Sequence, residues 1–409
     1  MTTNIKSSHL PHLKLRGGAE GGGVKKTKVR HSIFRLLYSM YSPLRYIGHI
    51  INKSRPIHLT FFLTKRCNAK CPFCFYLKNT PPIPPLPRGG NWGGNKSEEL
   101  SLDEILKISR SLGNLLWVAF SGGEIYLRDD LAEISKIFYK NNKPAIMLFP
   151  TNGLLPELIK ERTEQILKHC PKSIIAVKLS LDGINKAHDT LRNTPGSFDK
   201  TIQTYRLLEK LVDKYPNFEL GINTVFCSEN QDSMDDIIDF AGNLKNIKTH
   251  TISLIRGNLK DDSYKKVDYK KYHNAINRLE KNLKNKTSST YRFRGARIKA
   301  AQDILQRRLI HQTMLEQKRI IPCYAGKLNL VLTENGEVYP CEILTDSCGN
   351  VRNYDYDLGK VMQSGKAQQI IHSIQAKQCF CTHECYLMTN ILFNPGLYHK
   401  LAKEYVQLR

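Results

Sequence analysis

The sequence Thr64-Lys65-Arg66-Cys67-Asn68-Ala69-Lys70-Cys71-Pro72-Phe73-Cys74 places three thiols in the spacing C-x3-C-x2-C. It directly follows the apolar run from Leu59 to Leu63, which predicts a strand that leads into a cysteine-bearing loop. A structural zinc site or a closed iron–sulfur cluster takes four protein ligands. Three thiolates therefore indicate a metal centre with one open position. A zinc loop that takes a distant fourth ligand is the alternative.

Cysteine usage and charge narrow the class of protein. The chain has 409 residues, 11 cysteines and a formal net charge of +25. Nine cysteines fall into two groups, within residues 67–74 and 323–385, while Cys170 and Cys227 are isolated and expected to be buried. Grouped cysteines without a signal peptide predict metal ligands in the cytoplasm. No apolar run approaches the length of a membrane span.

The excess positive charge is concentrated near the N-terminus. Residues 1–66 hold 13 Lys and Arg against a single acid, Glu20, so the main body is not expected to be a dedicated nucleic-acid binder. Residues 1–30 predict a disordered basic tail, and residues 31–56 predict a basic amphipathic helical arm. Within the arm, residues 31–52 would either pack against the main domain, which we favour, or make a weak contact with an anionic membrane surface.

A strand–helix alternation runs from Ile57 to about residue 285. Six apolar strands, each followed by an amphipathic helix, predict an α/β fold with a parallel sheet, most simply a partial (βα)6 TIM-like barrel. The loop at residues 79–96 interrupts the rhythm and is interpreted as a lid. The expected strands are 57–63, 115–121, 145–150, 173–181, 219–226 and 250–255, and the expected helices are 102–112, 131–141, 156–169, 198–214, 233–244 and 269–283.

Small and polar residues follow the strands at the edge where parallel folds build their sites. The second strand ends in Ser121-Gly122-Gly123-Glu124, and the third ends in Thr151-Asn152-Gly153. The fourth ends in Ser180-Leu181-Asp182-Gly183, with His188 and Arg192 shortly after it, and the fifth carries Asn223. Their order predicts one site shared with the cysteine loop.

These motifs together resemble those of the radical S-adenosylmethionine (SAM) enzymes over residues 57–285. The resemblance implies that Cys67, Cys71 and Cys74 hold a [4Fe–4S] cluster whose fourth iron binds SAM. It also implies that the Gly-Gly-Glu run forms hydrogen bonds with the SAM amino group, and that Ser180 and Asp182 after the fourth strand face the ribose and methionine moieties. Arg192 is then implied to pair with the SAM carboxylate. The chain departs from the family in having Ile125 where Pro is more usual. The implied SAM contacts are Phe73, Gly122, Gly123, Glu124, Asn152, Ser180, Asp182, Arg192 and Asn223.

The C-terminal third carries a second group of cysteines. Cys323 and Cys341 flank Asn335-Gly336, a strong signal for a β-hairpin that brings them together. With Cys379, Cys381 and Cys385 this region resembles the SPASM/twitch extension, which binds auxiliary [4Fe–4S] clusters. The full SPASM pattern has seven cysteines. This region has six, one of which, Cys348, lies in an unmatched loop, and this favours the one-cluster twitch form. A zinc ribbon is the alternative, since spacing does not select the metal.

The auxiliary cluster needs four thiolates, for which five compete. We expect Cys323, Cys341, Cys381 and Cys385, because three intervening residues would give the last two sulfurs one face of a helical turn. Cys379 is the alternative. The corresponding boundaries are a helical linker at 286–321, a small α+β iron–sulfur domain at 322–395 and a C-terminal tail at 396–409.

The resemblance implies an enzyme that cleaves SAM reductively and abstracts hydrogen from a substrate. A peptide or protein substrate is favoured because SPASM/twitch extensions often accompany peptide maturation, and a carbohydrate or lipid-linked substrate is the rival. A flavodoxin- or ferredoxin-type protein is the expected electron donor. A zinc-containing nucleic-acid-binding protein would use the charge but would leave the strand-end motifs unexplained.

Overall fold

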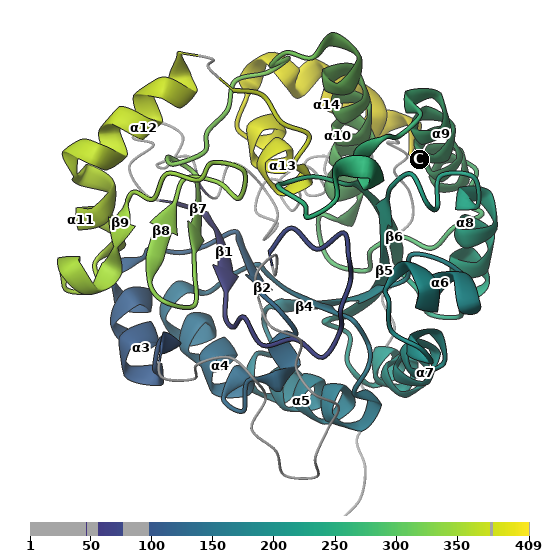
Figure 1. Cartoon of the computed structure of the whole chain (residues 1–409), viewed down its shortest axis with the longest axis horizontal. Coiled ribbons are helices and arrows are strands. Elements are labelled where there is room, and N and C mark those ends of the chain that lie inside the picture. Colours follow the sequence, from purple (N-terminus) through teal and green to yellow (C-terminus); the bar gives the residue numbers. More distant parts are fainter. Residues whose placement is uncertain (1–45, 47–55, 77–97, 377–378, 409) are drawn as a thin grey trace, which may run out of the picture.

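The computed structural model describes residue 46 and residues 56–76, 98–376 and 379–408 (Figure 1). Strands and helices alternate around a single nine-stranded sheet in the order β6-β5-β4-β3-β2-β1-β7-β8-β9. The strands are β1 (His58–Phe62), β2 (Trp117–Ser121), β3 (Ile146–Thr151), β4 (Ile174–Ser180), β5 (Phe218–Phe226), β6 (Thr249–Leu254), β7 (Asn329–Leu332), β8 (Glu337–Tyr339) and β9 (Gly349–Asn350). The α-helices are α3 (Leu102–Ser111), α4 (Leu131–Asn142), α5 (Pro156–His169), α6 (Lys186–Leu191), α7 (Ser197–Lys214), α8 (Met234–Asn243), α9 (Tyr269–Lys284), α10 (Ala296–Glu316), α11 (Leu358–Gln363), α12 (Gly365–Gln375), α13 (Glu384–Leu392) and α14 (Tyr398–Gln407).

The six predicted strand–helix units are confirmed, each boundary within two residues. Strands β1 to β6 pair in parallel and in sequence order. Figure 1 shows the helices of these units on the outside of the curved sheet. The partial barrel expected from the alternation is therefore the observed fold.

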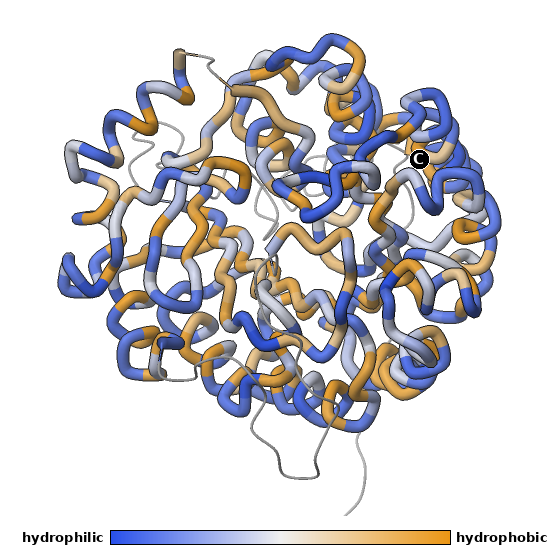
Figure 2. Tube along the Cα trace, in the orientation of Figure 1, coloured by the Kyte–Doolittle hydropathy of each residue, from blue (hydrophilic) through white to orange (hydrophobic). Residues whose placement is uncertain are grey.

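Period-two alternation in the strands separates a helix-covered outer face from a lined interior. In β4, Ile175, Val177 and Leu179 are fully buried in the main hydrophobic cluster. The alternate residues of the same strand, Ile174, Ala176, Lys178 and Ser180, line an interior cavity. Figure 2 shows the same division, with hydrophobic residues along the strands and hydrophilic residues on the outer turns of the helices.

The C-terminal third extends the barrel sheet. The predicted hairpin is confirmed as β7 and β8, which pair antiparallel. Strand β7 also pairs in parallel with β1, in a register that sets His58 beside Asn329. The sequence did not predict this second pairing, which joins the two halves through a continuous ladder.

The last described residues also differ from expectation. We expected residues 396–409 to form a tail, but residues 398–407 form α14. Helix α14 packs along α10, where Arg308 Nη1 lies 2.6 Å from Glu404 Oε1. Among the helices that the structure describes, none is long and apolar enough to cross a membrane.

The basic tail, most of the amphipathic arm and the loop at 79–96 lie outside the described residues. Tyr46, within the arm, is described: it is buried and donates a hydrogen bond to the Leu115 carbonyl oxygen at 3.1 Å. At this residue the arm contacts the barrel, as the packed alternative requires.

Candidate active site

The backbone of the cysteine loop packs directly against the end of β2, because Gly122 and Gly123 there have no side chains. Gly123 N–H donates to the Thr64 carbonyl at 2.7 Å, and Glu124 N–H donates to the Arg66 carbonyl at 2.8 Å. A Cβ at Gly122 would lie 2.4 Å from the Thr64 carbonyl oxygen, and one at Gly123 would lie 2.1 Å from that of Arg66. Gly122 also has φ +133°, a conformation that other residues rarely adopt. The Gly-Gly pair thus lets the two loops touch backbone to backbone.

A buried network of ion pairs and hydrogen bonds also holds the cysteine loop in place. Arg66 Nε and Nη2 donate to the two carboxylate oxygens of Glu99 at 3.1 and 3.2 Å. Arg128 donates to the carbonyl oxygens of Leu63 and Leu100 at 3.2 and 3.0 Å. Sequence reasoning missed Glu99 and both arginines, because their partnership joins segments that no local pattern connects.

Glu124 joins the end of β2 to the end of β3. Its carboxylate is buried and accepts hydrogen bonds from Tyr126 N–H, Thr151 Oγ1 and Asn152 N–H at 3.2, 3.0 and 2.8 Å. Burial raises the pKa of Glu124 to about 7, although these three donors act to lower it. The Asn152 amide in turn donates to Asn68 Oδ1 in the cysteine loop at 2.8 Å.

Asp182 and Arg192 form a buried ion pair beside the loop. Arg192 Nε donates to Asp182 Oδ2 at 2.8 Å, and Asp182 Oδ1 accepts from Val225 N–H at 2.7 Å. Asp182 is fully buried and does not line the cavity, whereas Arg192 does. The structure therefore gives Asp182 the position of a residue that orients Arg192.

His188 orders the turn between them. Its Nδ1 accepts a hydrogen bond from Asp182 N–H at 3.1 Å, and burial lowers the pKa of this imidazole to about 4, so that it stays neutral.

One cavity of about 390 Å³ connects the predicted site residues. Its wall includes all three thiols of the loop, and Phe73 lies among them with an exposed fraction of 7%. Asn223 Oδ1 accepts a hydrogen bond from Ser253 at 3.0 Å within the same wall. The predicted residues in this wall are Cys67, Cys71, Phe73, Cys74, Gly122, Gly123, Glu124, Asn152, Ser180, Arg192 and Asn223.

The donor set of the loop fits a cluster with one open iron. Burial raises the pKa of Cys67 to about 12 and that of Cys71 to about 11, so both thiols are neutral before loading and must release protons to bind metal. The Arg192 guanidinium acts to lower the pKa of Cys71 and supplies positive charge beside the loop. In the part of the chain that the structure describes, no three Cys, His, Asp or Glu side chains already stand where they could hold a metal ion.

The second cysteine group surrounds another, smaller cavity. Four thiols line this space of about 50 Å³, from Cys323, Cys341, Cys379 and Cys381, among mostly apolar side chains. Cys385 lines the large cavity instead. The expectation that Cys381 and Cys385 share a helical turn is wrong, because α13 begins only at Glu384.

Charged residues tie the second cysteine group to the barrel. Arg256, just beyond β6, donates to Glu384 Oε2 at 2.9 Å and lies 3.7 Å from Glu342 Oε2. His383 Nε2 lies 2.7 Å from Glu342 Oε2. In the sequence, Glu342 directly follows Cys341 and Glu384 directly precedes Cys385. This adjacency could have indicated the contact, but sequence reasoning did not use it.

Comparison with known proteins gives three findings. Residues 61–241 match the family model described as the radical SAM superfamily. The antilisterial bacteriocin subtilosin biosynthesis protein AlbA of Bacillus subtilis is 27% identical over 359 residues, which cover 84% of this chain and 70% of that protein. The AdoMet-dependent heme synthase of Methanosarcina barkeri is 24% identical and covers 74% of this chain and 81% of its own length.

A solved structure shares the fold. Streptococcus suis SuiB bound to precursor peptide SuiA superposes with a TM-score of 0.53 at 15% identity, over 88% of this chain and 75% of that one.

Proposed function

Because this chain belongs to the radical SAM superfamily through residues 61–241, we propose that it uses radical chemistry to modify a peptide or protein substrate. The family's cofactors are a [4Fe–4S] cluster and SAM. When bound, the reduced cluster supplies the electron that cleaves SAM into methionine and a 5′-deoxyadenosyl radical, which takes a hydrogen atom from the substrate. The chain itself binds, orients and shields the reactants.

The residues around the cysteine loop divide this work. Cys67, Cys71 and Cys74 would ligate the cluster, and Arg192, oriented by Asp182, would pair with the SAM carboxylate. Glu124 is proposed to accept from the SAM amino group, with Ser180 facing the ribose and methionine moieties and Asn223 making a further polar contact to SAM. Phe73 and the strand side chains exclude water from this edge.

We expected Cys323, Cys341, Cys381 and Cys385 to ligate the auxiliary [4Fe–4S] cluster, but Cys385 lies in the wall of the large cavity. The four thiols that line the small cavity, Cys323, Cys341, Cys379 and Cys381, are therefore the proposed ligands, with Cys385 as the alternative. Cys379 Sγ accepts a hydrogen bond from Arg319 Nη2 at 3.0 Å, and its carbonyl oxygen accepts another at 2.7 Å. These contacts hold Cys379 at the wall of the small cavity.

The observation that carries the proposal is the shared cavity. The wall that holds the first cysteine group also includes Glu342, Glu384 and Cys385 from the second. A substrate in this space would lie between SAM and the auxiliary site. The names of AlbA and of the SuiB complex, a bacteriocin biosynthesis protein and a protein bound to a precursor peptide, favour a peptide as that substrate.

The test uses full-length protein reconstituted anaerobically with iron, sulfide and SAM. Candidate precursor peptides deuterated on their side chains and α-carbons should transfer deuterium to 5′-deoxyadenosine. Replacing Cys67, Cys71 and Cys74 together by Ala should abolish 5′-deoxyadenosine formation while iron at the second site remains. Retained 5′-deoxyadenosine in that triple variant would contradict the radical SAM assignment of the loop.

Two finer proposals concern partners. A flavodoxin- or ferredoxin-type protein would supply the electron, and residues 31–52 would make a salt-sensitive contact with anionic membranes if they are not fully packed on the barrel. Both stay predictions.

A further inference from the structure

The large cavity extends through the barrel. One end, here called the SAM edge, lies at the strand ends that carry the proposed SAM contacts, and the lower part lies at the opposite end. It is lined by Trp117, Ile146 and Ile174, which begin their strands at that end. Helix α10 contributes Lys299, Asp303 and Arg307 to the same wall. The proposed SAM contacts use only the upper edge, so the lower part has no assigned role.

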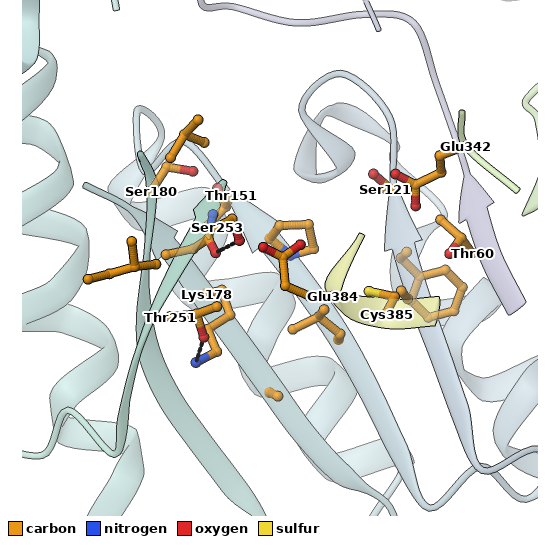
Figure 3. Close-up of a pocket in the computed structure, with 18 of the residues that line it drawn as sticks. Thr60, Ser121, Thr151, Lys178, Ser180, Thr251, Ser253, Glu342, Glu384 and Cys385 are labelled. Carbon is orange, nitrogen blue, oxygen red and sulfur yellow. Dashed lines mark hydrogen bonds between the residues drawn. The ribbon is translucent and has the colours of Figure 1, made fainter. Parts of the chain in front are cut away.

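Lys178 directs an ammonium group into this lower part. It lies two residues before Ser180 on the same face of β4, about 7 Å deeper in the barrel. Its Nζ donates to Thr249 Oγ1 on β6. It also donates to Thr251 Oγ1, on the same strand, at 3.3 Å (Figure 3). The ammonium crosses β5 at Gly221, where an added Cβ would lie 2.6 Å from Nζ.

Arg307 reaches the same place from α10. Its Nη2 donates to the His250 carbonyl oxygen at 3.4 Å, next to Thr251, while its Nη1 is buried without a hydrogen-bond partner. Within the described residues, neither Lys178 nor Arg307 forms an ion pair. Two cations therefore meet near one point of β6 with donor capacity to spare.

The lower cavity carries excess positive charge. Its cations are Lys178, Lys299 and Arg307, against the two carboxylates of Glu219 and Asp303. Asp303 is already paired with Lys299. Glu219 Oε1 accepts a hydrogen bond from Arg292 N–H at 2.7 Å, and burial raises the pKa of this carboxyl group. An uncompensated buried cation is costly, so a bound anion would stabilise this region.

We propose that Lys178, Arg307 and Thr251 form a subsite that binds a carboxylate of the substrate. Anchored there, the substrate would extend upward through the mostly apolar barrel and present its reacting carbon at the SAM edge. This inference rests on the proposed function in treating the cavity as the substrate site. A single negative charge matches the excess of one cation, which favours a carboxylate over a phosphate.

The state of Lys178 is consistent with an anion subsite. Burial lowers the pKa of Lys178 to about 7. A carboxylate beside the ammonium would favour the charged form and raise this pKa again.

The test measures binding of a simple probe to the anaerobically reconstituted, SAM-loaded full chain. Hexanoate labelled with 13C at its carboxyl carbon is titrated by NMR, with hexanamide as the neutral isostere and ionic strength held constant with NaCl. Hexanoate should bind about tenfold or more tightly than hexanamide. Lys178→Gln should weaken hexanoate binding about tenfold to a hundredfold. Lys172→Gln, at an exposed lysine just before β4, should change nothing.

Each alternative outcome is informative. Equal hexanoate affinity in the wild type and Lys178→Gln, equal binding of hexanamide and hexanoate, or no binding by the wild type would overturn the subsite. Circular dichroism and SAM binding check that Lys178→Gln is folded; if it is not, Arg307→Gln takes its place with the same expected loss. Hexanoate binding without deuterium transfer from any peptide would leave the subsite standing while the peptide proposal fails.

Discussion

The buried pair of Arg192 and Asp182 allows stability and SAM binding to be separated. Their side chains are 9% and 0% exposed, with Nε and Oδ2 2.8 Å apart. Arg192→Ala leaves the Asp182 carboxylate buried without its partner, which should cost about 3–5 kcal/mol of unfolding free energy. The same change removes the proposed partner of the SAM carboxylate, so SAM affinity should fall about tenfold to a hundredfold.

The double variant Arg192→Met/Asp182→Asn distinguishes the two effects. Replacing both charges together is often close to neutral for stability, and the Asn oxygen can still accept from Val225 N–H, whose bond to Asp182 is 2.7 Å long. We therefore expect stability to recover while SAM affinity stays low.

Urea unfolding followed by circular dichroism measures the first quantity, and anaerobic calorimetry with SAM measures the second. Iron content should stay constant, and Arg206→Ala, at an exposed arginine on α7, is the charge control. Recovery of SAM affinity together with stability would refute a direct role for Arg192.

Three further predictions follow from the site and its supports. Gly123→Ala should lower iron bound at the first site, since the new Cβ would lie 2.1 Å from the Arg66 carbonyl oxygen; unchanged iron would mean the loop can shift freely. Fully loaded protein should hold about eight irons per chain, falling to about four in Cys379→Ala and staying near eight in Cys385→Ala, and the reverse pattern would exchange the two ligands. Burial acts to raise the pKa of Glu104 on α3, but hydrogen bonds from Arg352, whose Nε donates to Oε1 at 2.7 Å, and from Ser101 lower it to about 2. The stabilising effect of this carboxylate is therefore present above about pH 4.5 and lost as pH falls toward 2, and Glu104→Gln should flatten acid unfolding in that window.

Local sequence patterns predicted the elements of the barrel and much of its site. Each parallel strand is covered by helices on its outer face and carries mostly apolar residues, and its helix repeats apolar residues at a helical period, so both are visible in a short window. The cysteine loop and the Gly122-Gly123 turn could be predicted for the same reason, because each is formed by residues that are neighbours in the sequence. The register of the strands then places these loops at one edge.

Features that depend on distant partners were not predictable in this way. The Arg66–Glu99 bond joins segments 33 residues apart, across a stretch with no regular pattern. The orientation of Cys385 depended on where α13 begins, and His383, the N-cap residue, accepts from Cys385 N–H at 3.2 Å. In the sequence, Lys178 is one polar residue within a predicted strand, and nothing nearby indicates a role for it. Only the three-dimensional arrangement of the strands shows that its ammonium faces an interior cavity.

The pairing of β7 with β1 has a consequence for how the chain is made. His58 and Asn329, neighbours across that ladder, are 271 residues apart in sequence. While the chain emerges from the ribosome, β1 can pair with β2 early, but its other edge must wait for almost the entire protein. An unpaired strand edge is a template for association with other chains, and such distant closure slows folding. Fragments that end near residue 285 should therefore aggregate, and co-expression with residues 286–409 as a separate chain should rescue their yield.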